Sequence, residues 1–455
     1  MSIRAPFFAG PALLALLALL ALLVLLVLLP ACASYAPLPL DRQAAPKDSL
    51  AQLDGGAALP AALGPDEIGL LVLRNSPALR AARAQRGVAQ AQLLAAGIPP
   101  NPSIGASYGF LIGGPGTSAA LSAGISEDLK SLVTLSARRS AARASAQEVD
   151  ASLLWQEWQT VGQGRLLAIA LIEGERQRQL LQQTQGLLQD RLERSRQALA
   201  RGDTTLATVV PDLTAADDLR KQLDDLQRQQ QTRRRDLAAL LGLSPQAGLP
   251  LADHVDLPAA DPAVVRQLLP DLADRRPDLV ALQLGYRAQE EKVRGAILAQ
   301  FPTLSFGGSY ARDNSDIRTA GPQITFELPL FDRNQGNIAL ERASRQQLYD
   351  EFGARLAAAR SEVLAMLADI GLLRDQLATR KAQLAGLDLA AARADAAFAA
   401  GDLDERGYVD LQLARQAKQQ EILSLEQTLL EQQQAIALLT GAGLPPVQLP
   451  PPENS

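Results

Sequence analysis

The stretch Pro102-Ser103-Ile104-Gly105-Ala106-Ser107-Tyr108-Gly109-Phe110 alternates apolar side chains with Ser and Gly. A second stretch, Pro302-Thr303-Leu304-Ser305-Phe306-Gly307-Gly308-Ser309-Tyr310, repeats this alternation in the same phase 200 residues later. Successive side chains of a β-strand point to opposite faces of the sheet, so a period of two is typical of a strand. Each stretch therefore predicts a strand with one apolar face and one face of small polar residues.

Each of these strands is followed by turn residues and by a second alternating segment. The turn residues are Gly113-Gly114-Pro115-Gly116 in the first case and Asp313-Asn314-Ser315 in the second. The four expected strands cover residues ~102–112, ~119–129, ~302–312 and ~321–331, roughly ten residues each. A tilted strand needs about this length to cross a bilayer.

Two interpretations of the strands are open at this point. Soluble hairpins would pack one face on a core, but their outer face would be expected to carry charges rather than Ser, Thr and Gly. Strands that cross a membrane would explain both the apolar face and the small polar face. A four-stranded sheet, however, has two unpaired edges that hydrocarbon does not tolerate. The smallest membrane barrels have about eight strands. If the chain is exported, several copies must therefore share one barrel.

The sequence contains an internal repeat. Ser76-Pro77-Ala78-Leu79 matches Arg276-Pro277-Asp278-Leu279 at an offset of 200 residues, and Ala200-Arg201-Gly202-Asp203 matches Ala399-Ala400-Gly401-Asp402 at 199. An offset this steady predicts a duplication. We expect a first repeat over residues 66–245, a connector over 246–261, a second repeat over 262–444 and a short tail over 445–455.

Long helices are expected after each strand pair. No proline occurs between Pro115 and Pro211, or between Pro329 and Pro445. Steps of three and four residues mark a coiled-coil seam at Leu356, Ala359, Val363, Met366, Ile370, Leu373, Leu377, Leu384, Leu387 and Ala391. A helix over residues 333–400 would be about 100 Å long, which no ordinary globular domain needs.

The first 31 residues predict an export signal. Arg4 precedes an apolar run over residues 12–29, and Cys32, the only cysteine, follows Leu29-Pro30-Ala31. This arrangement resembles the lipobox of bacterial lipoproteins, in which the cysteine is acylated, although Pro30 departs from the usual residue type there. The alternative is that residues 12–29 stay as a transmembrane anchor. Residues 32–65, rich in Ala and Pro, predict an extended linker.

The composition offers few of the residue types that catalytic sites use. The 455 residues carry a net charge of −5 with mixed signs, so no basic surface for nucleic acid is indicated. One histidine (His254) and one cysteine argue against a zinc cage, a disulfide framework or a Cys/His nucleophile pair. We expect no enzyme activity, no cofactor and no metal site.

The charged residues gather where the long helices reverse. Gly202-Asp203 and Gly401-Asp402 predict the reversals, since a glycine ends one helix and an aspartate can cap the next. Arg406 and Asp410 follow the second reversal. One interpretation is capping within a solvated loop. The other is a ring of acidic residues around the axis of an oligomer, which would select cations or be held by arginine partners.

The sequence resembles the TolC-like outer membrane factor family, in particular its lipoprotein branch. The features that carry this resemblance are Cys32, the paired Pro–strand units, the segment Pro329-Leu330-Phe331-Asp332 after the last strand, and the Gly-Asp reversals. The resemblance covers residues 66–444. It implies a membrane α+β fold: a homotrimer whose twelve-stranded β-barrel, four strands per chain, continues into an α-helical coiled-coil barrel across the periplasm. It also implies that Gly202, Asp203, Gly401, Asp402, Arg406 and Asp410 lie at a periplasmic tip and gate.

The function implied by the resemblance is the outer-membrane channel of a tripartite efflux pump. Such a channel conducts small molecules or metal ions passively, and its partners are a periplasmic adaptor, an inner-membrane pump of the resistance-nodulation-division (RND) type and outer-membrane lipid. Two alternatives remain open: a channel for type I protein secretion, and a periplasmic coiled-coil adaptor lipoprotein.

Overall fold

The structure is a computed structural model, and it describes residues 35–43, 45–56, 60–442 and 446–447. The chain divides into two units, Met1–Ala45 and Pro46–Ser455, and every helix and strand named below belongs to the second. The expected export signal and Cys32 lie outside the described residues. Within those residues, no helix combines the length and the apolar character that a membrane crossing requires.

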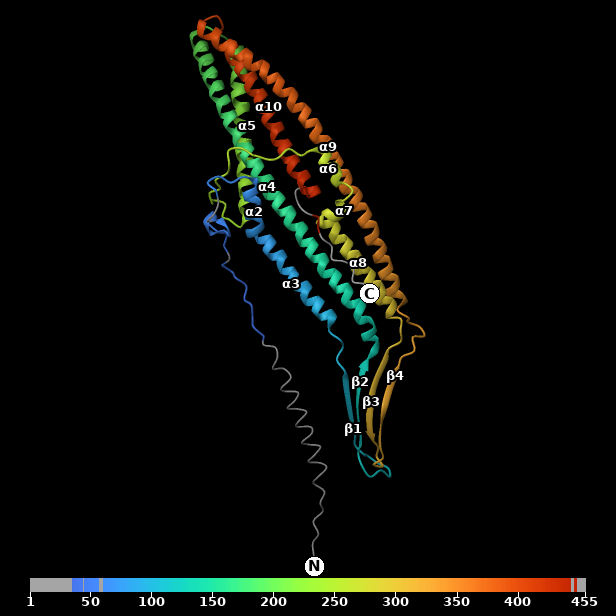
Figure 1. The fold of residues 1–455 in the computed structure, drawn as a ribbon. Coiled ribbons are helices and arrows are strands. Elements are labelled where there is room, and N and C mark those ends of the chain that lie inside the picture. Colours follow the sequence, from blue (N-terminus) through green and yellow to red (C-terminus); the bar gives the residue numbers. More distant parts are fainter. Residues whose placement is uncertain (1–34, 44, 57–59, 443–445, 448–455) are drawn as a thin grey trace, which may run out of the picture. The chain divides into compact units, whose positions relative to one another are not determined.

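Two halves of the second unit have similar element orders (Figure 1). After a short 3₁₀ helix, η2 (Leu50–Gln52), the first half contains α2 (Pro65–Asn75), α3 (Pro77–Gly97), β1 (Ser103–Gly109), β2 (Ala120–Asp128), α4 (Leu129–Arg201) and α5 (Leu206–Leu241). The second half contains α6 (Pro262–Leu268), α7 (Leu272–Arg275), α8 (Pro277–Leu298), β3 (Leu304–Arg312), β4 (Arg318–Phe326), α9 (Gln335–Ala400) and α10 (Glu405–Thr440).

The four strands form one antiparallel sheet in the order β1-β2-β3-β4. Its register places apolar residues opposite one another, such as Ile104 with Ile125 and Phe306 with Ile324. The other face carries small polar residues, and Ser107 Oγ lies 2.8 Å from Ser122 Oγ across β1 and β2. The alternation read from the sequence thus continues across the four strands, except that Glu127 of β2 lies on the apolar face opposite Phe306.

The apolar face of the sheet is uncovered in the chain. Ile104 is 79% exposed, Ile324 66% and Phe326 53%. The outer strands, β1 and β4, each have one neighbour and therefore one free edge. A soluble hairpin would bury its apolar face against a core, and within the described residues this sheet does not.

Two strand boundaries differ from those read from the sequence. The last strand was expected over ~321–331, but β4 spans Arg318–Phe326, so Leu328 and Leu330 lie beyond it. Regular pairing ends there because β3 begins at Leu304. One further hydrogen bond follows, from the Glu327 N–H to the Thr303 carbonyl at 3.0 Å, and Pro329 has no backbone N–H to donate. Likewise β1 ends at Gly109, and Phe110 stays outside, because β2 begins only at Ala120.

The seam read from the α9 sequence faces the other helices of the same chain. Val363 and Ile370 are fully buried, and they pack with Leu279 of α8 and Ile436 of α10. Other apolar residues of α9, such as Leu372 and Leu389, are 58% and 67% exposed. A second seam joins α4 to α5 through Leu181, Leu188, Leu219 and Leu226.

Both long helices end at the expected glycines. Gly202 and Gly401 adopt φ values of 80° and 82°, a left-handed conformation that side chains with a Cβ rarely adopt. The expected capping by the neighbouring aspartates is wrong. Asp404 caps α10 by accepting the Gly407 N–H at 2.8 Å, because the turn continues for two residues after Asp402. Asp203 instead pairs with Arg201 at 2.9 Å, and α5 begins after Thr205 without a side-chain cap.

Candidate functional site at the helix reversals

A cluster of charged side chains joins three helices close to the two reversals. Arg191 and Ser195 come from the last turns of α4, Asp212 from the beginning of α5, and Arg406 and Asp410 from the beginning of α10. Figure 1 shows these turns at the end of the long helices away from the strands. We call these five residues the tip cluster.

Asp212 is the centre of the tip cluster. Its side chain is only 2% exposed, and its Oδ1 lies 2.8 Å from Arg191 Nε and 3.1 Å from Arg406 Nη2. Its Oδ2 accepts a hydrogen bond from Ser195 Oγ at 2.6 Å. A buried carboxylate needs such partners, because an unpaired buried charge is strongly unfavourable. Asp212 therefore ties α4 and α10 to α5.

Two further ion pairs join α4 to α10. Arg191 Nη1 pairs with Asp410, and Arg194 pairs with Glu405. The Arg191 side chain is 13% exposed, whereas that of Asp410 is 58% exposed. Arg191 is thus largely buried between two carboxylates, one enclosed and one open to solvent. The exposed pair contributes less to stability than the enclosed one.

On its other side α10 is held to α9. The rings of Phe398 and Tyr408 stack with their centroids 4.7 Å apart. The Tyr408 hydroxyl donates a hydrogen bond to Asp395, which raises the pKa of Tyr408 above its usual value. Arg415 Nε lies 2.5 Å from Asp388 Oδ1, which adds an ion pair between the same helices. The chain therefore presents two helical hairpins, α4/α5 and α9/α10, which the tip cluster joins.

The residues selected from the sequence have different surroundings in the structure. Arg406 and Asp410 are brought together in the tip cluster, whereas Asp203 only pairs with its neighbour Arg201, and Asp402 is exposed. Arg191 was missed. A signal for it existed, because Leu181, Leu188 and Ser195 follow a seven-residue spacing, and Arg191 lies at the intermediate step of three after Leu188.

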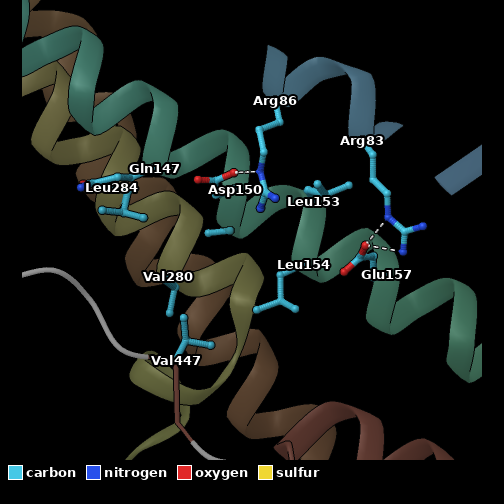
Figure 2. Close-up of a pocket in the computed structure, with 11 residues that line it drawn as sticks. Arg83, Arg86, Gln147, Asp150, Leu153, Leu154, Glu157, Val280, Leu284 and Val447 are labelled. Atoms are coloured by element: carbon cyan, nitrogen blue, oxygen red, sulfur yellow. Dashed lines mark hydrogen bonds and ion pairs between the residues drawn. The ribbon is translucent and has the colours of Figure 1, made fainter. Parts of the chain in front are cut away.

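A groove of about 560 Å³ lies between α3, α4 and α8. Figure 2 shows Arg83 and Arg86 reaching from α3 toward Glu157 and Asp150 on α4, with ion-pair distances of 2.7 and 2.6 Å. The rest of the lining is apolar, Val447 included, apart from Gln147. Both arginines are thus paired with carboxylates of α4. The described residues also contain no cluster of three or more His, Cys, Asp or Glu side chains able to hold a metal ion.

Comparison with known proteins agrees with this architecture. Residues 268–442 match the family described as outer membrane efflux protein. The outer membrane protein OprJ of Pseudomonas aeruginosa is 26% identical over 169 residues, which are 34% of this chain and 35% of OprJ. The alignment thus spans about a third of that relative.

Solved structures resemble nearly the whole chain. CusC, whose structures concern folding and transmembrane channel formation, superposes with a TM-score of 0.66 at 21% identity, over 90% of this chain and 99% of CusC. The MtrE outer membrane channel of Neisseria gonorrhoeae gives 0.64 at 16% identity, over 90% and 99%. These likenesses establish the fold. The family match covers residues 268–442, and the shared fold extends over 90% of the chain.

Proposed function

We propose that this chain is the outer-membrane channel of a tripartite efflux system. It conducts small molecules or metal ions passively, while an inner-membrane RND-type pump supplies the energy and a periplasmic adaptor connects the two. The observation that carries this proposal is the sheet, whose apolar face is exposed and whose opposite face is lined with Ser, Thr and Gly. An apolar outside and a small polar inside are what the wall of a water-filled membrane barrel requires.

The free edges of β1 and β4 determine how the barrel closes. An unpaired edge leaves backbone N–H and C=O groups without partners, and each costs several kcal/mol in hydrocarbon. One chain supplies four strands, whereas membrane barrels need about eight or more. We therefore propose that β4 of one copy pairs with β1 of the next. Three copies would give the twelve strands expected from the family resemblance, with the helices continuing the barrel into the periplasm.

The tip cluster supports a closed resting state of the channel. For α10 to move away from the α4/α5 hairpin, Arg406 must leave Asp212, and Asp410 must leave Arg191. The stacked pair Phe398–Tyr408 would let α9 and α10 move as one body. We propose that contact with the adaptor opens the tip by separating the two hairpins.

The lipid anchor is proposed on the sequence alone. Cys32, directly after the expected export signal, would carry the acyl chains that hold the N-terminus in the outer membrane. Cells grown with labelled palmitate are expected to label the unmutated protein and not the Cys32→Ala variant, while both proteins still assemble. An unlabelled parent protein would contradict the anchor.

The channel itself is tested with purified protein. Native mass spectrometry in detergent is expected to show three copies, and planar bilayers are expected to show discrete conductance steps after the protein is added. The control is a refolded deletion variant that lacks residues 103–128, which contain β1 and β2. A water-soluble monomer that leaves bilayer conductance unchanged would overturn the proposal.

A further inference from the structure

The apolar face of the sheet ends in two arginines. Along β3 and β4 this face carries the cross-strand pairs Leu304–Phe326, Phe306–Ile324, Gly308–Pro322 and Tyr310–Ala320. The next pair on the same face is Arg312–Arg318, at the end of the strands next to the connecting loop. Like charges directly opposite one another on a sheet are destabilising. A mobile or bound anion beside them would offset this repulsion.

Among the described residues, only Asp316 forms an ion pair with these arginines, and both distances are long. Asp316 Oδ1 lies 3.9 Å from Arg312 Nε and 3.7 Å from Arg318 Nη2, longer than the 2.7–2.9 Å typical of charge-assisted hydrogen bonds. The neighbouring Asp313 carboxylate is held in the loop by its Oδ1, which accepts the N–H groups of Ser315 and Ile317 at 2.8 and 2.9 Å, and within the described residues it forms no ion pair with either arginine.

Several guanidinium donors are therefore free to bind a further group. Each guanidinium carries five N–H donors. Arg312 donates from Nη2 to the Ala119 carbonyl at 3.2 Å, its Nε is buried, and its side chain as a whole is 29% exposed. The side chain of Arg318 is 63% exposed. Forked guanidinium donors match the oxygens of a phosphate group.

The distance along β3 places this pair at the boundary of the hydrocarbon, provided that the sheet crosses the membrane as proposed above. The span from Leu304 to Arg312 is about 27 Å along the strand at the usual rise per residue, or about 20 Å along the membrane normal at the tilt of 35–45° found in membrane barrels, and the long arginine side chains extend it toward the edge of the apolar band of about 25 Å. The strands join the helices at their other end, and those helices are assigned to the periplasm. The arginines then lie at the outer leaflet, level with its lipid headgroups.

We propose that Arg312 and Arg318 form a binding site for the phosphate group of an outer-leaflet lipid. The two guanidinium groups hold the phosphate oxygens from β3 and β4, and Asp316 keeps the two side chains side by side. The lipid chains lie against the apolar face formed by Tyr310, Phe306 and Ile324. A site of this kind fastens the barrel to the headgroup layer at a fixed depth.

The test measures lipid retention by the full chain in detergent micelles, by native mass spectrometry. The probes are lipid A with both phosphates, the same glycolipid without phosphates, and inorganic phosphate. The variants are Arg312→Gln/Arg318→Gln and, as a matched control, Arg333→Gln, an exposed arginine beyond the other end of the sheet.

Phosphorylated lipid A is expected to bind the parent protein and the Arg333→Gln variant equally. Its affinity for the double variant is expected to fall at least about tenfold, as the loss of charge-assisted contacts implies. Equal retention by the double variant would overturn the site, as would equal binding of the dephosphorylated glycolipid. Displacement of the lipid by inorganic phosphate at the same concentration would overturn the lipid as its ligand.

The conductance of the same preparations separates this inference from the proposed function. A double variant that conducts like the parent protein but has lost phosphorylated lipid supports the site. Micelle binding does not require a conducting pore, so a parent protein that binds phosphorylated lipid through Arg312 and Arg318 without conducting would refute the channel and leave the site standing.

Discussion

The Asp212→Asn variant is expected to leak. Asp212 is 2% exposed and neutralises Arg191 and Arg406, so its replacement leaves Arg191 buried with only the exposed Asp410 as partner. Breaking a buried ion pair by removing one partner costs about 3–5 kcal/mol. If the tip cluster holds the hairpins together, a loss of this size shifts the ratio of open to closed channels by about a hundredfold or more. Single-channel recording measures that ratio directly.

Two variants calibrate this result. Asp218→Asn makes the same charge change at an exposed site of α5 and is expected to behave like the parent protein. Asp410→Ala removes only an exposed pair, which is worth up to about 1 kcal/mol, so its open probability should rise about fivefold at most. An Asp212→Asn channel that stays as closed as the Asp218→Asn channel would show that the tip cluster plays no part in closure.

The Ile324→Arg variant is expected to prevent insertion of the barrel. Ile324 lies on the apolar face two residues from the middle of β4 and is 66% exposed in the single chain. Arginine on the lipid face of a membrane barrel costs about 2–4 kcal/mol near the midplane. Every copy in the assembly carries this cost, so it is multiplied by the number of chains. Refolding into lipid vesicles, followed by gel mobility without heating, measures the assembled fraction.

The neighbouring residue provides the control. Gln323 faces the opposite side of the sheet, where its Oε1 would lie 3.7 Å from a Cβ added at Gly124. Gln323→Arg introduces the same side chain one position away, and this variant is expected to assemble and to alter only ion selectivity. If both arginine variants assembled equally well, the assignment of the apolar face to lipid would be wrong.

The strands could be read from the sequence because their signal is local. A period of two needs only the residues of one strand, and Ile104, Tyr108 and Phe306 display it directly. The end of β4 could not be read in this way. Leu328 and Leu330 continue the alternation, but pairing stops where the partner strand begins, and that depends on a segment more than twenty residues earlier in the chain.

The candidate site shows the same division. Gly401 was predictable because a helix end that needs a positive φ favours glycine, and Arg406 and Asp410 were found through their closeness to it. Arg191 lies on a seven-residue spacing that the sequence shows, but its pairing could not be read, since its partner Asp410 is 219 positions away and no local pattern records an ion pair between helices of different repeats. Asp402 was selected on residue type, and the structure leaves it exposed.

The two open edges of the sheet also determine the kinetics of biogenesis. In the proposed assembly a solitary subunit has no stable inserted form, so insertion and oligomerisation are a single event whose rate depends on a power of subunit concentration greater than one. A tether at Cys32 would confine newly exported subunits to a plane and raise their effective concentration there. The acyl chains on Cys32 would then act before the pore exists, because they shorten the time that each free strand edge needs to meet the edge of another subunit.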